Sequence, residues 1–490
     1  MIIYGGNEMA KIETLITFGI YLIFLMGVGV YFYKRTQSSE DYIIGGRGLG
    51  SWVTALSAQA SDMSGWLLMG LPGAVYISGM SQIWVIVGLA LGTYLNWKFV
   101  AAKLRTQTEE TDTMTIPNFL SRKLGDEKGY IRTFSAVVIL FFFTIYSASG
   151  LVAAGKLFES ILGIDYKLAV LIGGFTIIFY TFMGGYLACC WTDFFQGALM
   201  FFAILVVPAA AYFHGGRIEG IESAMAAKNI TLKIFNGGGK AEILAMISSI
   251  AWGLGYFGQP HILVRFMSVK SVKELVKARR IAMIWVLISL VGAIAVGITG
   301  IAVFKSVSEL GGDSEKVFIY LIAKLFNPWV GGVLLAAILS AIMSTIDSQL
   351  LVSSSTLTED FYNYIKKDVS EKEKIWTGRI CIIIISAVAY AIALNPSAKV
   401  LSMVAYAWAG FGGVFGPAVL MTLYSKNLNW KSVFCGMLVG TVTIILWKQF
   451  GYGEYLYEII PAFLLNGAVI YTGEKFFFAK KEMLVSAYKK

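Results

Sequence analysis

Two short stretches interrupt otherwise apolar segments of the chain and decide its fold. The first, from Ala55 to Trp66, reads ALSAQASDMSGW, and the second, from Trp252 to His261, reads WGLGYFGQPH. Each lies inside a segment long enough to cross a bilayer, which takes roughly 20 mostly apolar residues. Glycine and proline inside such a segment disfavour a continuous helix. The sequence therefore predicts two membrane helices that are broken near the middle of the bilayer.

The composition places the whole chain in a membrane. Its 490 residues are 57% hydrophobic and only 14% charged, and the mean hydropathy is +0.70. Apolar stretches recur along nearly the whole length, which excludes a soluble domain on a single anchor. The alternating segments of about 10 residues that mark an outer-membrane barrel are absent. We expect an all-α integral membrane protein, because helices satisfy their own backbone groups in lipid.

Hydropathy divides the chain into about thirteen spans. The fifth and sixth are separated only by Gly184, Gly185 and a few neighbours. No stretch between spans is long enough for a soluble catalytic domain. The expected spans are 11–33, 50–75, 79–102, 132–158, 167–185, 189–213, 243–267, 281–305, 328–359, 379–396, 400–424, 433–450 and 457–474.

The two interruptions occupy corresponding places in this topology. They fall in the second and seventh spans, so the two segments cross the membrane in opposite directions. Proteins built from inverted repeats place ions and solutes at such paired breaks. Glycine clusters also serve as packing sites, so either break alone would be weak evidence. We predict one domain over residues 1–490, with repeats at 50–213 and 243–424 and peripheral helices at 11–33 and 433–474.

Lysine and arginine are concentrated on one predicted face of the membrane. They cluster between Lys103 and Arg132, Arg265 and Arg280, Lys366 and Arg379, and Lys475 and Lys490. The positive-inside rule makes this face cytoplasmic. With an odd number of spans, the N-terminus lies outside and the C-terminus inside a multi-pass protein of the cell inner membrane. We attribute the net charge of +10 to topology and to anionic headgroups, and expect no nucleic-acid partner.

Two connecting segments predict short helices outside the spans. The segment 103–131 contains Thr115, Ile116 and Pro117, which suit a helix start with proline in the first turn. The segment 214–242 is rich in glycine and small residues and predicts a short surface helix.

Cysteine and histidine give no pattern of a metal or catalytic site. We expect four free thiols, at Cys189, Cys190, Cys381 and Cys435, because their spacing matches no metal motif. A membrane enzyme would need a nucleophile or a metal cluster facing water, and the sequence offers neither. We therefore expect no enzyme activity and no cofactor.

Three aspartates within the spans are candidate functional residues, because an ionised acid in the bilayer is costly unless it is compensated. Asp62 lies beside the first break and could bind a cation or hold freed backbone N–H groups. Asp193 is either functional or a cap at the mouth of the sixth span. Asp347 offers oxygens together with Asp193 and Ser348 but no compensating positive charge. We expect Asp193 and Asp347 to share a second cation or a proton.

The ninth span carries hydroxyls on one helical face. Ala341, Ser344, Thr345 and Ser348 are three or four residues apart. Such hydroxyls, with carbonyls freed at a neighbouring break, can bind a small hard cation. Alternatively, they bond only to carbonyls of their own helix.

Several motifs resemble the bacterial sodium/proline symporters of the solute:sodium symporter family, from about Asp41 to Phe450. The resemblance implies a leucine-transporter-like inverted repeat of thirteen helices and sodium-coupled import of proline by alternating access. The motifs are ASDMSGWLLMGLPG from Ala60, YTFMGG from Tyr180, WTD from Trp191, the second interruption from Trp252, MST from Met343 and AYAWAGFGG from Ala405.

The resemblance also implies roles for single residues. A sodium ion would bind the carbonyls of Ala60, Met63 and Ala341 and the hydroxyls of Ser344 and Thr345. Asp62 would be needed for sodium dependence. Asp347 departs from the proline symporters, which have a small uncharged residue there. Together with Asp193, Ser344 and Ser348, it falls where some family members hold a second sodium ion. The proline pocket would draw on Trp252, Tyr256, Pro260, Tyr146, Ser64 and Gly65.

Other functions remain open at this point. A sodium symporter for pantothenate, sialic acid or a sugar is the main alternative, because the family changes solute through a few pocket residues. A sensor-kinase input would need a further domain after Lys490, and a channel would need no paired breaks. We expect sodium, proline or a similar small solute, and membrane lipid as partners of a functional monomer.

Overall fold

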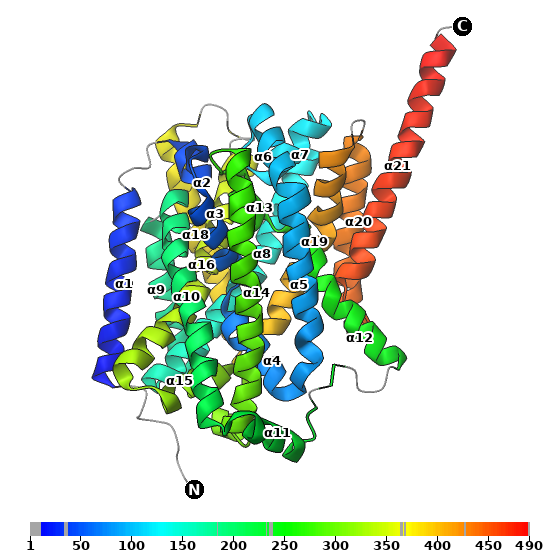
Figure 1. The fold of residues 1–490 in the computed structure, drawn as a ribbon. Helices are drawn as coiled ribbons and strands as arrows, with labels where there is room; N and C mark the ends of the chain where they lie inside the picture. The colour runs from blue at the N-terminus through cyan, green and yellow to red at the C-terminus, as the bar shows by residue number, and fades with distance from the viewer. Residues whose placement is uncertain are drawn as a thin grey trace.

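The computed structural model describes residues 11–33, 38–183, 185–231, 233–234, 239–362, 366, 369–425 and 428–488. Every regular element in these residues is helical, and their β pairing is one bridge between Leu49 and Val269. The helices run side by side from one end of the molecule to the other (Figure 1). The prediction of an all-α protein is confirmed.

Ten helical runs in the described residues are long and apolar enough to cross a bilayer. This count treats Trp66–Glu110 as one continuous run, and it leaves the thirteen spans and the limits of the two repeats as predictions. The ten runs are Ile12–Phe32, Trp66–Glu110, Tyr130–Leu162, Tyr186–His214, Lys240–Gly258, Val272–Val303, Pro328–Tyr362, Lys372–Ala393, Val400–Tyr424 and Trp430–Gln449.

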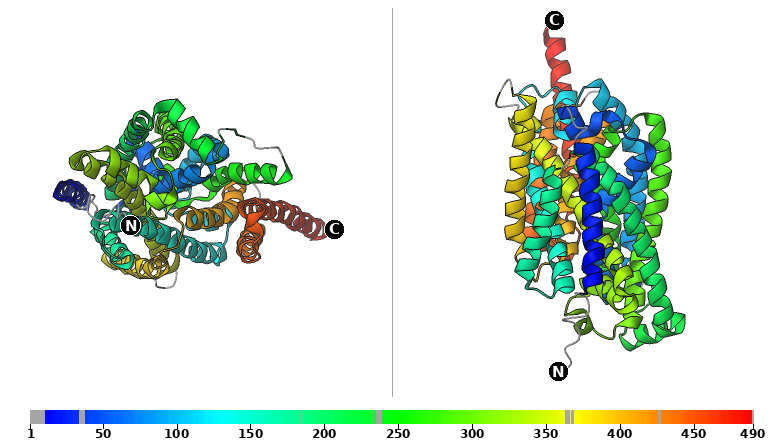
Figure 2. Two further views of the ribbon diagram at one scale, coloured as in Figure 1. Left: turned by 90° about the horizontal axis from the view of Figure 1, so that it is seen from below. Right: turned by 90° about the vertical axis from the view of Figure 1, so that its left-hand side faces the viewer.

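Burial separates central helices from peripheral ones. The most apolar window of the run containing α16 (Pro328–Ser355) is 83% buried, whereas that of α1 (Ile12–Tyr33) is 17% buried. Figures 1 and 2 show α1 on the outside of the bundle, with α20 (Trp430–Gln449) and α21 (Ile459–Tyr488) at the opposite edge. α16 is therefore well placed to carry a site shielded from lipid.

The first interruption ends α3 (Ser51–Asp62) in the interior. Met63 leaves the helical conformation with φ −84° and ψ 69°. The chain resumes at Trp66 as a π-helical segment through Gly70 and continues as α4 (Leu71–Ser78). Small residues allow this break to pack tightly, since a Cβ added at Gly65 would lie 3.0 Å from the Cβ of Ala153.

The second interruption separates α12 (Lys240–Ile250) from α13 (Pro260–Met267). Between them lies a 3₁₀ segment, Ala251–Gly258, followed by Gln259 in an extended conformation. Pro260 can begin α13 because the first residue of a helix needs no N–H partner. The 3₁₀ segment packs closely on α19 (Val400–Tyr424): a Cβ at Gly255 would lie 1.8 Å from Nε1 of Trp408. Glycine is therefore required there.

Short helices cover both ends of the bundle (Figure 1). At one end, α7 (Ile116–Leu124) begins as predicted, with the Thr115 side chain accepting from the Asn118 amide and a proline in the first turn. At the other end, α11 (Arg217–Ala227) confirms the short helix predicted within 214–242. The boundary predicted around Gly184 and Gly185 falls partly outside the described residues, because Gly184 is not described.

The remaining helices complete the bundle. The other α-helices are α2 (Ser39–Ile44), α5 (Ile83–Leu95), α6 (Ala101–Glu110), α8 (Tyr130–Leu162), α9 (Tyr166–Met183), α10 (Tyr186–His214), α14 (Val272–Val303), α15 (Val317–Leu325) and α18 (Glu371–Ala393). The other short segments are Gly45–Arg47, Gly79–Gln82, Asn96–Val100, Val307–Leu310, Ser314–Lys316, Thr356–Tyr362 and Tyr452–Glu454.

Candidate functional site

The first interruption leaves a backbone carbonyl beside two hydroxyls of α16. In a continuous helix the amide of Ser64 would donate to the carbonyl of Ala60, but it donates to Asp62 at 3.0 Å. The Ala60 carbonyl instead accepts from the hydroxyl of Ser344 at 2.8 Å and from that of Thr345 at 3.4 Å. All five residues are buried, so these oxygens gather away from bulk water.

The same hydroxyls also bond within their own helix. Ser344 and Thr345 donate to the carbonyl of Ala341 at 3.3 and 3.2 Å. The hydroxyls therefore do not bond only to their own helix, because they also reach the carbonyl at the neighbouring interruption. Ala60, Ala341, Ser344 and Thr345 share one hydrogen-bonded cluster, and Met63 is fully buried at the interruption itself. These neutral oxygens suit a small hard cation, which prefers oxygen ligands.

Asp62 links the two interruptions. Its Oδ2 accepts a hydrogen bond of 2.7 Å from the hydroxyl of Tyr256, which lies in the second interruption. Its backbone carbonyl accepts from Nε1 of Trp66 at 3.2 Å and from the hydroxyl of Tyr146 at 3.4 Å. Asp62 is fully buried. The residue predicted for sodium dependence thus contacts two residues predicted for the solute pocket.

An aromatic cluster lies beside Asp62. The ring centroid of Trp252 is 6.3 Å from that of Trp66, 6.4 Å from Trp408 and 5.7 Å from Tyr457. Nε1 of Trp408 donates to the Trp252 carbonyl at 2.7 Å, and its ring meets that of Tyr256 edge to face at 5.1 Å. We call these five residues the aromatic cluster. Trp408 was part of a recognised motif but Tyr457 was not, and neither was predicted as a site residue.

The other predicted pocket residues lie at two places. Ser64 and Gly65 are buried within the first interruption, next to Trp66. Pro260, at the start of α13, lines a cavity of about 20 Å³ together with Thr115, Val264 and others. That volume holds about one water molecule. Pro260 therefore faces the end of the bundle where α7 lies.

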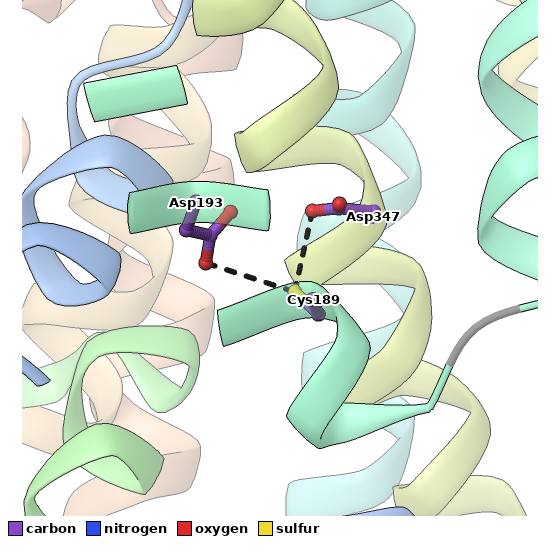
Figure 3. A group of neighbouring side chains, drawn as sticks. All are labelled: Cys189, Asp193 and Asp347. Atoms are coloured by element: carbon purple, nitrogen blue, oxygen red, sulfur yellow. Dashed lines mark hydrogen bonds between the residues drawn. The ribbon is translucent and has the colours of Figure 1, made fainter. Parts of the chain in front are cut away.

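A second buried group joins α10 to α16 (Figure 3). Cys189 lies between the two aspartates, with Sγ 3.7 Å from Oδ2 of Asp193 and 3.5 Å from Oδ1 of Asp347. The Sγ atom is also 3.3 Å from the hydroxyl of Ser348. The ligand atoms of Cys189, Asp193 and Asp347 all lie within 4.8 Å of one another. We call these three residues the acidic cluster, and the structure brings it together with Ser348 as the second-cation prediction requires.

Arg265 of α13 provides a positive charge at this cluster. Its Nη2 donates to Oδ2 of Asp193 at 3.1 Å and to Oγ of Ser348 at 2.6 Å. Both members of the Arg265–Asp193 ion pair are fully buried. A buried ion pair is tolerated only when further hydrogen bonds satisfy both partners. Here Ser57 adds one, donating to Asp193 at 2.6 Å.

The structure excludes one alternative for this region and contradicts two expectations. Asp193 is not a cap at the mouth of a span, because it is fully buried. The acids do not lack a compensating charge, because Arg265 pairs with Asp193. Arg265 itself was counted among the topology-determining charges, yet it does not reach the surface. The signal that could have identified it is its position in an apolar half-helix, PHILVRFM, directly after the second interruption.

The sequence matches the model of the sodium:solute symporter family over residues 42–440. The chain belongs to this family. A sodium/proline symporter of Salmonella typhimurium is 46% identical over 467 residues, which cover 94% of this chain and 92% of the relative. The high-affinity proline transporter PutP of Bacillus subtilis is 47% identical, with coverage of 89% and 92%. The family membership inferred from the motifs is confirmed.

Solved structures show the same fold. A sodium-coupled sialic acid symporter, captured in a substrate-bound outward-open state, aligns with a TM-score of 0.80 at 19% identity, over 95% of this chain and 98% of that one. MhsT in complex with L-phenylalanine aligns with a TM-score of 0.52 at 15% identity, over 85% and 97%. The predicted leucine-transporter-like fold is confirmed.

Proposed function

We propose that this protein is a sodium-coupled symporter that imports L-proline by alternating access, and that it is not an enzyme. The observation that carries the proposal is the link through Asp62. One carboxylate oxygen accepts from Tyr256, while the peptide chain on either side of Asp62 supplies Ala60 and Met63. A solute bound near Tyr256 and an ion bound near Ala60 would therefore influence each other. The names of the two proline-transporting relatives support proline as the solute.

The sodium ion binds among Ala60, Met63, Ala341, Ser344 and Thr345 in this proposal, and we call these residues the Ala60 cluster. The carbonyls of Ala60, Met63 and Ala341 and the hydroxyls of Ser344 and Thr345 supply five oxygens. In the described structure both hydroxyls lie within hydrogen-bonding distance of the Ala60 carbonyl. A sodium ion would turn both hydroxyl oxygens toward itself. Asp62 stabilises the interruption on which two of the carbonyls depend, which accounts for its role in sodium dependence.

Proline binds between the two interruptions in this proposal. Its pyrrolidine ring is apolar and suits the faces of Trp252 and Tyr256. Tyr146 lies nearby, with its hydroxyl bonded to the Asp62 carbonyl. The carboxylate of proline suits the N-terminus of the half-helix that begins beside Ser64 and Gly65, and its ammonium suits freed carbonyls. Pro260 allows the chain to turn into α13, toward the end of the bundle where α7 lies.

The orientation follows from the positive-inside rule. The end of the bundle that carries α6 and α7 is cytoplasmic in this proposal. The cluster of lysine and arginine between Lys103 and Arg132 lies on and around these two helices. α1 starts at the opposite end of the bundle (Figure 1). The protein then lies in the inner membrane with its N-terminus outside and its C-terminus inside, surrounded by lipid and functional as a monomer. Cysteine labelling from each side of the membrane tests this orientation.

Uptake into proteoliposomes tests the function. Radiolabelled L-proline should accumulate above its external concentration when a sodium gradient points inward. A potassium gradient of the same size is the control and should give no accumulation. Unlabelled pantothenate, sialic acid and glucose are competitors. Proline uptake that does not depend on sodium would contradict the proposal. So would uptake that another solute inhibits while unlabelled proline does not.

The second cation site predicted at Asp193, Asp347 and Ser348 stays a prediction. Any ion there would share its space with the guanidinium of Arg265.

A further inference from the structure

Arg265 is held by four helices at once. Its Nε lies 3.2 Å from the hydroxyl of Ser57 on α3, and its Nη1 donates to the carbonyl of His261 on α13 at 2.8 Å. Its Nη2 reaches Asp193 on α10 and Ser348 on α16. The guanidinium is planar and carries its donors in a fixed geometry, so these contacts define its position well.

The atoms that bind Arg265 are the ones that a second cation would need. Oδ2 of Asp193 and Oγ of Ser348 lie 3.1 and 2.6 Å from Nη2. A sodium ion in contact with both oxygens would therefore lie directly against this nitrogen. Two positive charges so close together repel strongly away from water. The guanidinium and a free cation therefore exclude each other at these oxygens.

The remaining oxygens show that the cluster has unused capacity. Oδ1 of Asp193 and Oδ2 of Asp347 are buried and accept no hydrogen bond in the described structure. Buried carboxylate oxygens without a donor are uncommon. If the guanidinium were absent, these two atoms together with Ser57 and Ser348 would offer oxygens to a cation with no basic group bonded to them.

We propose that the guanidinium of Arg265 is a built-in cation that takes the place of a second coupling ion at Asp193 and Ser348. The proposal rests on the sodium symport proposed above. The protein then moves one sodium ion with each solute molecule, bound at the Ala60 cluster. The oxygens around Asp193 form a latent sodium site that opens only when Arg265 is removed.

Replacement of the guanidinium tests the proposal. Arg265→Gln keeps hydrogen-bonding groups but removes the charge, so sodium should enter the cluster. The parent should transport about one sodium ion per proline and the variant about two, with a Hill coefficient for sodium that rises from about 1 to about 2. Reversal potentials measured in proteoliposomes give the ion-to-solute ratio. Arg105→Gln is the matched control: Arg105 is also buried, but it bonds the carbonyl of Val269 and pairs with Glu109.

Thermal stability gives a readout that does not depend on transport. Arg265→Gln strands a buried charge on Asp193, so it should be less stable than the parent in potassium and regain much of the loss in sodium. The double variant Asp193→Asn with Arg265→Gln lacks both charges. Its stability should respond to sodium no more than that of the parent.

The outcomes separate this proposal from the proposed function. If the parent shows no sodium-driven proline uptake, the proposed function fails, and the stability measurement still tests the cluster. The built-in cation is overturned if the parent moves two sodium ions per proline, or if Arg265→Gln keeps the parent's ratio and Hill coefficient. It is also overturned if Arg265→Gln fails to fold in sodium while the double variant folds, because sodium then does not replace the guanidinium.

Discussion

The hydroxyl of Tyr256 donates a hydrogen bond of 2.7 Å to Oδ2 of Asp62 across a separation of 194 residues. The two residues belong to the two interrupted segments, so the bond joins the breaks directly. Both side chains are buried almost completely. In the proposed function this contact couples the solute pocket to the sodium site, because a change at either end moves the same carboxylate.

Tyr256→Phe should raise the sodium concentration needed for half-maximal uptake by roughly ten-fold or more. The variant keeps the ring but leaves Oδ2 of Asp62 without its donor, and a hydrogen bond to a charged group contributes about 1.5–3 kcal/mol. Sodium titration of proline uptake measures the effect. Tyr166→Phe is the control, because its hydroxyl bonds the carbonyl of Ala393 at the end of α18 and not Asp62. Equal sodium dependence in both variants would show that the Tyr256 bond is only structural.

Replacing Ser344 with Ala and Thr345 with Val should weaken sodium binding by about a hundred-fold or more, because two hydroxyl ligands vanish at roughly ten-fold each. The shape of α16 changes little, so folding should be preserved. Sodium-dependent stabilisation against heat measures binding directly. Ser340→Ala, one turn earlier on the same helix, removes a hydroxyl that bonds Tyr21 and the carbonyl of Ala336. If the double variant binds sodium as tightly as the parent and Ser340→Ala do, the sodium site lies elsewhere.

Trp252→Ala should weaken proline binding at saturating sodium by several-fold. Each aromatic contact adds about 0.5–1.5 kcal/mol beyond its area, and Trp252 packs against three other rings. Trp252→Phe should recover part of the affinity because it restores an aromatic face. Competition binding with labelled proline makes the comparison. Trp376→Ala, at a half-exposed position on α18, should have no effect. An unchanged affinity for proline in Trp252→Ala would show that proline does not bind at the aromatic cluster.

Asp313, in the segment between α14 and α16, should make stability depend on pH in acid. Burial alone would raise the pKa of Asp313, but hydrogen bonds from Lys156 and Lys399 outweigh it and lower the pKa to about 2. A carboxyl with a lowered pKa stabilises the folded state above its unfolded pKa and loses that contribution as the pH falls toward the folded value. Asp313→Asn should therefore melt below the parent at pH 7, and the gap should narrow between about pH 4 and pH 2.

Melting temperatures across this range measure the gap. Asp165→Asn is a control at the same end of the bundle, because among the contacts described the carboxylate of Asp165 bonds only to the nearby Lys167 amide. A gap between parent and Asp313→Asn that stays constant from pH 7 to pH 3 would show that the lysine contacts do not stabilise the ionised form.

The sequence by itself determined the membrane class, the two interruptions and the hydroxyl face of α16. These features are local. Glycine and proline act on the backbone where they stand, and residues three and four apart share a helix face whatever surrounds them. Ser344 and Thr345 could therefore be named from spacing, and the motif around Asp62 could be matched to a family.

Only the tertiary structure decided which partners meet. Arg265 and Asp193 are 72 residues apart, and the bond between them depends on how α13 and α10 both pack against α3. Tyr457 enters the aromatic cluster from outside both predicted repeats. Hydropathy averages over a window of residues and cannot distinguish a helix face toward lipid from one toward the interior. A buried arginine in a short apolar segment and an arginine at a membrane surface look alike in sequence, and only packing shows which one is paired.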